Sequence, residues 1–137
     1  MNEMETIATQ QLNKLVFLYQ KILPLWSFPF IPLGIAAIFQ SFAWMSGPIF
    51  LKNFSLLPRI LILWLFALGE YSFMSPSMNA GVEILNMSES LLVVIYQVIT
   101  LVVFMIINIV VFRQKFELKY AISFLLLSIT VYVAYMW

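Results

Sequence analysis

The sequence contains no cysteine and no histidine. These absences exclude disulfides, thiolate chemistry, most zinc sites and the commonest general base of enzymes. Glycine-rich phosphate loops and nucleophile elbows are also missing from the printed sequence. We therefore expect no catalytic residues, no bound metal and no cofactor, and we predict that the protein is not an enzyme.

Charged residues are also scarce. They make up 9% of the 137 residues, while hydrophobic residues make up 64%, and soluble domains typically contain about 25% charged residues. The composition predicts an integral, multi-pass membrane protein of a bacterial inner membrane or an organelle inner membrane, with the lipid bilayer as its surroundings. A net charge of +1 gives no reason to expect nucleic-acid binding.

The few charges divide the chain into apolar segments. We predict helices at about residues 30–50, 57–74, 91–112 and 118–137. The third is uncharged over 22 residues, which is enough to cross a hydrocarbon core of about 30 Å. We expect Ser88 to cap its N-terminus and the Ser75-Pro76-Ser77 stretch to end the second helix. The predicted fold is all-α, an antiparallel four-helix bundle formed by residues 28–137.

Residues 1–27 form a separate predicted unit, an amphipathic helix followed by a linker. Apolar side chains recur at helical spacing between residues 4 and 22, and Gln10, Asn13, Lys14 and Lys21 fall largely on the opposite side. Such a helix lies in the membrane interface or packs on a partner protein.

The basic residues predict an orientation. Lys52 and Arg59 lie in the first link between spans, and the 113–119 link is also basic, whereas the link between the second and third spans has acids only. The positive-inside rule places both basic links on the cytoplasmic, matrix or stromal side and both termini opposite.

Glu70 is the most informative polar residue because it lies inside a predicted span. A carboxylate there costs several kcal/mol unless it is protonated, paired or hydrated. One interpretation is a proton-coupling acid. The other is a structural acid that forms hydrogen bonds at the broken end of the second helix.

Other polar and aromatic residues in the spans are candidates for a transport path. Gln97 and Thr100 lie near Phe104 and Asn108 on one face of the third span, and Gln40 lies in the first. The alternative is that these groups only hydrogen-bond between helices. The aromatic residues that could contact a cation are Phe42, Trp44, Tyr71 and Tyr96.

Several short motifs occur in the order and spacing of a known family. They are FAW at 42–44, EY at 70–71, Pro76 and VITLVVF at 98–104. The chain from about residue 33 to 137 resembles small four-helix bacterial membrane proteins that are assigned to the drug/metabolite transporter superfamily. The resemblance implies a four-helix bundle like half of a larger transporter, paired with a second copy.

The chain departs from this family pattern at three places. Tyr96-Gln97 stands where the family has Gln-Glu, Ser77-Met78-Asn79 where it has Ala-Asn-Arg, and residues 45–48 replace a stretch containing histidine. Glu70 is retained.

Two functions are therefore expected. The first is a small, proton-coupled carrier of a small molecule that works as a homodimer, with Glu70, Gln97, Thr100, Gln40, Trp44 and Tyr71 as the substrate or coupling residues. The second is a non-transporting accessory subunit that packs against other membrane subunits in a larger assembly, such as an energy-converting complex.

Overall fold

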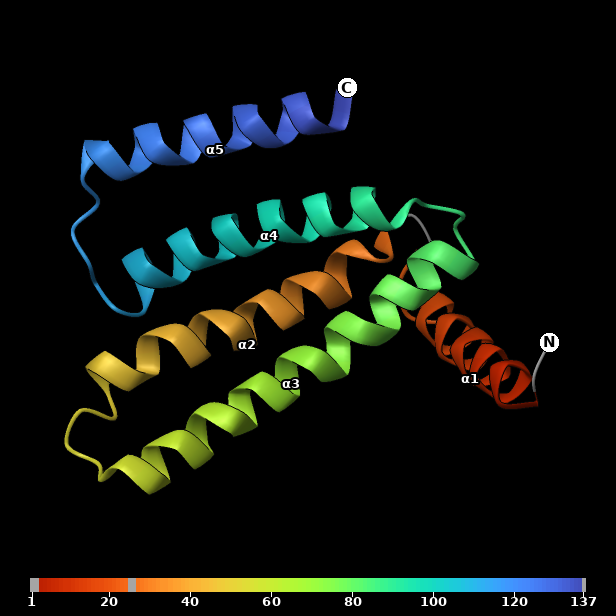
Figure 1. Cartoon of the computed structure of the whole chain (residues 1–137), viewed down its shortest axis with the longest axis horizontal. Coiled ribbons are helices and arrows are strands. Elements are labelled where there is room, and N and C mark those ends of the chain that lie inside the picture. Colours follow the sequence, from red (N-terminus) through yellow and green to blue (C-terminus); the bar gives the residue numbers. More distant parts are fainter. Residues whose placement is uncertain (1–2, 25–26, 137) are drawn as a thin grey trace.

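A computed structural model describes residues 3–24 and 27–136, and helices are the regular secondary structure in these ranges (Figure 1). The helices are α1 (Glu3–Gln20), α2 (Phe30–Ile49), α3 (Leu56–Glu83), α4 (Glu89–Val110) and α5 (Leu118–Met136). The predicted all-helical fold is confirmed.

Three of the described helices are long and apolar enough to cross a membrane, namely α2, α3 and α4. The apolar part of α5 is shorter, Leu118–Val133. The α4 helix begins as predicted, because the Ser88 hydroxyl accepts a hydrogen bond from the Leu91 N–H at 3.2 Å and so satisfies a free donor of the first turn.

The packed centre of the molecule lies where α2 meets α3 and α4. Leu33, Ala36 and Ala37 of α2 are fully buried and form one cluster with Tyr96 of α4. Ala36 and Ala37 are consecutive and have small side chains, so the helix backbones can approach closely. The large ring of Tyr96 fills the remaining space.

Aromatic pairs join α2 to α3. Phe39 stacks on Phe73 with ring centroids 6.0 Å apart, and Phe42 stacks on Phe66 at 5.9 Å. Gly69 makes this packing feasible, since a Cβ at that position would lie 2.6 Å from the Phe39 ring.

The predicted helix break at Ser75–Ser77 is wrong. The α3 helix is 28 residues long and continues through Pro76 to Glu83. Tertiary contacts override the local cost of the proline. The turns beyond Pro76 bury Ser77, Ala80 and Gly81, and a Cβ on Gly81 would lie 2.7 Å from the fully buried Leu92 of α4. Ending the helix at residue 74 would give up these contacts.

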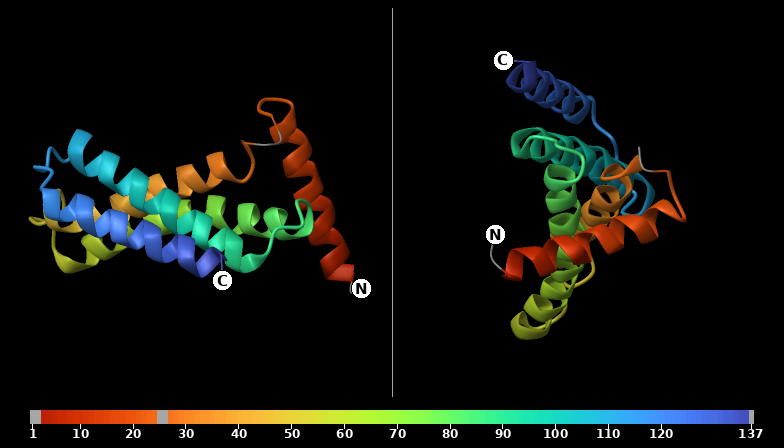
Figure 2. Two further views of the ribbon diagram at one scale, coloured as in Figure 1. Left: turned by 90° about the horizontal axis from the view of Figure 1, so that it is seen from above. Right: turned by 90° about the vertical axis from the view of Figure 1, so that its right-hand side faces the viewer.

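The α1 helix crosses the end of α3 at a steep angle to the other helices (Figure 2). Leu12 and Val16 of α1 pack with Phe28 and Ala80 in a second buried cluster. The division of the chain into units 1–27 and 28–137 stays a prediction.

The last helix, α5, lies beside α4 and farther from the centre than α2 or α3 (Figures 1 and 2). It follows the 111–117 link, in which Arg113 has a positive φ of 50°. A cavity separates part of α5 from α4, as described below.

Candidate functional site

Three polar side chains meet at mid-height between the spans. Gln40 and Glu70 lie at the midpoints of α2 (Phe30–Ile49) and α3 (Leu56–Glu83), and Tyr96 lies in the first half of α4 (Glu89–Val110). The Tyr96 hydroxyl is 2.8 Å from Glu70 Oε1 and 3.3 Å from Gln40 Oε1. We call Gln40, Glu70 and Tyr96 the polar centre.

The Tyr96 hydroxyl has one proton, so it can donate to only one of the two acceptors at a time. A phenol donates one hydrogen bond and can accept others. The shorter distance favours donation to the Glu70 carboxylate, and the Gln40 amide, turned by 180°, presents an N–H to the phenol oxygen. Each of the three groups then has a partner within the membrane.

Glu70 is half-buried, whereas Tyr96 is only 5% exposed. In the described ranges Glu70 has no Lys or Arg within ion-pair distance. Tyr96 is therefore its hydrogen-bond partner, and a buried carboxyl group in the middle of a membrane span needs such a partner.

The remaining predicted site residues do not join these three hydrogen-bonded groups. Thr100, one turn after Tyr96, is 3% exposed, and its hydroxyl lies close to the Tyr96 hydroxyl but outside hydrogen-bond geometry. Gln97 is exposed. Trp44 packs edge-to-face on Phe104, with centroids 5.9 Å apart, and Tyr71 is 60% exposed on α3. The structure thus brings Glu70 and Gln40 together but not Gln97, Trp44 or Tyr71.

The sequence did not predict the role of Tyr96, which was considered only as one of four aromatic residues that could contact a cation. The sequence nevertheless contains a signal for the hydrogen bond between Tyr96 and Glu70. A tyrosine inside an apolar span needs a hydrogen-bond partner for its hydroxyl, and Glu70 is the acidic residue inside a neighbouring span.

The interpretation of Glu70 as a group that holds a broken helix end is wrong. The helix is unbroken at Pro76, and Glu70 contacts α4 instead.

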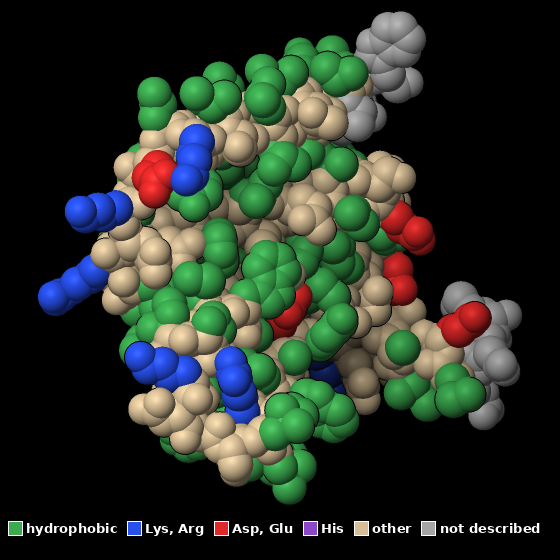
Figure 3. Space-filling model, turned by 60° about the vertical axis from the view of Figure 1, so that its left-hand side comes forward, with side chains coloured by type: hydrophobic (Ala, Val, Ile, Leu, Met, Phe, Trp, Pro, Cys, Tyr) green, Lys and Arg blue, Asp and Glu red, His purple; other side chains and the backbone are tan. Residues whose placement is uncertain are grey.

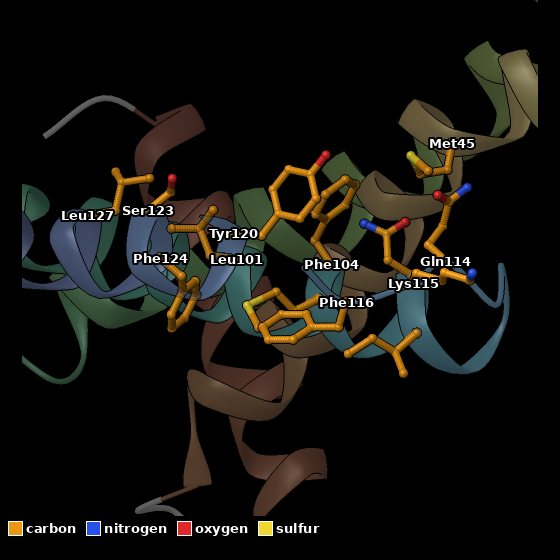
Figure 4. A pocket seen from close by; sticks show the side chains of 13 residues that line it. Met45, Leu101, Phe104, Gln114, Lys115, Phe116, Tyr120, Ser123, Phe124 and Leu127 are labelled. Atoms are coloured by element: carbon orange, nitrogen blue, oxygen red, sulfur yellow. The ribbon is translucent and has the colours of Figure 1, made fainter. Parts of the chain in front are cut away.

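A cavity of about 400 Å³ lies between α4 and α5 (Figure 4). Leu101 and Phe104 of α4 face Tyr120 and Phe124 of α5 across it, and Lys115 comes from the link between them. Asn108, which also lines the cavity, has a buried Oδ1 atom with no hydrogen-bond partner in the described ranges. The wall of the cavity is thus mainly apolar, with the Asn108 carbonyl oxygen as an acceptor that is free in the part of the chain that the structure describes. It lies on a different face of α4 from Tyr96, which packs on α2.

Comparison with known proteins identifies the family. A family model described as "Putative member of DMT superfamily (DUF486)" matches residues 29–135. No curated protein and no solved structure matches the chain. The matched region contains α2, α3, α4 and nearly all of α5, and it leaves out α1. The chain is thus a membrane protein that belongs to the DUF486 family of the DMT, or drug/metabolite transporter, superfamily.

Proposed function

We propose that this protein is a proton-coupled carrier of a small cationic or amphiphilic molecule, with Glu70 as the coupling acid. The observation that carries the proposal is the hydrogen bond from Tyr96 to Glu70 at the midpoint of α3. Membership of a family assigned to a transporter superfamily supports it.

The polar centre can hold Glu70 in both protonation states. An ionised Glu70 accepts a hydrogen bond from the Tyr96 hydroxyl. A protonated Glu70 can instead donate to the phenol oxygen, and the phenol then donates to Gln40 Oε1 at 3.3 Å. Because the hydroxyl and the amide offer Glu70 a hydrogen-bond partner in either state, we propose that a proton and a cation exchange at this carboxyl group.

A homodimer of four-span subunits is part of the proposal. Glu70 is half-buried, so one subunit leaves part of the carboxyl group uncovered. Lipid does not solvate a carboxylate, whereas a second copy, or water held between two copies, does. In the proposed arrangement α5 forms a fourth span, and α2 to α5 run antiparallel.

The proposed orientation follows from the basic links. Lys and Arg side chains gather at the end of the molecule where the 50–55 and 111–117 links lie (Figure 3). We propose that this end faces the side from which the protein is inserted.

Proton release on binding tests the proposal. Purified protein in weakly buffered detergent would be mixed with a panel of small organic cations while a pH dye reports released protons. A cation that displaces the Glu70 proton should release about one proton per site, and Glu70→Gln should abolish the release. The matched control is Glu83→Gln, which changes an exposed acid at the end of α3. Equal release from wild type and Glu70→Gln would contradict the proposal.

A further inference from the structure

The amphipathic helix α1 has more apolar surface than its contact with α3 covers. Leu12, Val16 and Tyr19 form one row at helical spacing, and this row packs on Phe28, Ala80, Ile84 and Leu85. A second row lies beside it, on the helix and on the turn that follows Gln20, and stays exposed. Its members and their exposed fractions are Met4 78%, Ile7 55%, Leu15 54%, Leu18 56% and Ile22 82%. We call these five residues the free row.

The opposite side of the helix is mainly polar, although it also carries the exposed ring of Phe17. At about 3.6 residues per turn, Gln10, Asn13, Lys14, Gln20 and Lys21 fall on the side that faces neither row. Lys14 and Lys21 are separated by two turns and lie along one border of the polar side. The apolar surface of α1 is therefore a broad band, and the free row is a part of it that the chain itself leaves exposed.

Local contacts join the end of α1 to the residues that lead to α2. The Tyr19 ring meets Phe28 edge-to-face, with centroids 5.1 Å apart. The Ser27 hydroxyl donates to the Pro24 carbonyl at 2.6 Å, so the Tyr19 hydroxyl donates to Ser27 Oγ at 2.7 Å. We call Leu12, Val16 and Tyr19 the docked row, and the free row lies outside their contact.

The contact point lies at the depth of a membrane boundary. Ala80, on which α1 packs, follows Glu70 by ten residues of continuous helix. Ten residues rise about 15 Å, which is half of a hydrocarbon core of about 30 Å. Arg59 lies about 16 Å from Glu70 in the other direction and so marks the opposite boundary. With the midpoint of α3 at mid-membrane, α1 crosses α3 where acyl chains meet headgroups.

We propose that the free row of α1 inserts into the lipid at this boundary, so that α1 lies in the membrane plane as an anchor on the side opposite the basic links. The steep angle between α1 and the spans fits this position (Figure 2). The borders of the band also fit, because Lys14 and Lys21 are placed to reach lipid phosphates while the free row enters the acyl region.

Spin labels distinguish lipid from water and from protein at the free row. The chain has no cysteine, so Leu18→Cys and Ile7→Cys each give a single nitroxide site in the full-length protein. Asn13→Cys is the matched control on the polar side. All three positions are exposed, which keeps the label from disturbing the docked row. The proteins would be placed in phosphatidylcholine vesicles with a minor share of anionic lipid, and collisions with oxygen and with a water-soluble nickel chelate would be measured.

We expect the labels at residues 18 and 7 to collide several-fold more with oxygen than with nickel, at a depth of about 5–10 Å below the headgroups. The label at residue 13 should show the reverse ratio. Nickel access at residue 18 equal to that at residue 13 would place the free row in water. Low access to both reagents at residues 18 and 7 would mean that a second copy or another protein covers it. Either result overturns the proposal, and neither bears on the coupling role of Glu70.

Discussion

The hydrogen bond between Tyr96 and Glu70 allows a quantitative prediction. Tyr96→Phe removes the hydroxyl group and keeps the ring that packs on Leu33 and Ala37, so the loss is confined to the polar centre. Hydrogen bonds to charged groups contribute about 1.5–3 kcal/mol, whereas side-chain bonds between membrane helices average about 0.6 kcal/mol and reach about 1.7. With a 2.8 Å bond, a buried Tyr96 and a half-buried Glu70, we expect a coupling free energy of about 1–1.5 kcal/mol.

A double-mutant cycle measures this coupling. The free energy of unfolding would be determined in mixed micelles, with increasing denaturing detergent and circular dichroism as the signal, for wild type, Tyr96→Phe, Glu70→Leu and the double variant. The coupling term removes effects that each substitution has on its own, including the gain from replacing an acid by leucine in a span. Tyr132→Phe is the control, because Tyr132 is an exposed tyrosine of α5, away from α3, and should show no coupling with Glu70→Leu beyond about 0.3 kcal/mol. Additive effects of Tyr96→Phe and Glu70→Leu would refute the polar centre.

Three further predictions follow from other parts of the fold. Gly81→Ala should lower the free energy of unfolding by about 1–3 kcal/mol, because the new Cβ would lie 2.7 Å from the fully buried Leu92. Gly34→Ala is the control and should be neutral or stabilising in the same assay, because nothing lies within 4 Å of its Cβ position. Ser88→Ala should cost about 1 kcal/mol, because the Leu91 N–H loses its cap at 3.2 Å; an unchanged unfolding free energy would show that water replaces the cap. In vesicles, single cysteines at Asn53 and Gln114 should react with a membrane-impermeant reagent from one side and a cysteine at Asn86 from the other, and labelling of Asn53 and Asn86 from the same side would contradict the proposed orientation.

The apolar periodicity and the charged links were enough to predict most helix boundaries. The predicted helices at 30–50, 91–112 and 118–137 correspond to α2, α4 and α5 within about two residues at each end. These boundaries depend on local signals, such as the Ser88 cap and the basic link after Val110, which act within a few residues of the chain.

Other features depend on contacts that the sequence does not display. The continuation of α3 through Pro76 depends on Gly81 packing against Leu92, and these residues come from different helices. The Tyr96–Glu70 bond likewise joins residues 26 positions apart. Helical spacing on α4 alone grouped Gln97 with Thr100, yet Thr100 is buried and Gln97 is exposed, because the position of α2 decides which side of α4 is covered.

The central claim is that Glu70 couples a proton to transport, and vesicle flux tests it most directly. Protein reconstituted into vesicles with an imposed pH gradient would be assayed for uptake of those organic cations that cause proton release from the purified protein. We expect wild type and Glu83→Gln to accumulate the cation as long as the gradient lasts, and Glu70→Gln, which keeps the size and hydrogen bonds of the side chain, to lose accumulation completely. Gradient-driven uptake that survives Glu70→Gln undiminished would contradict the account.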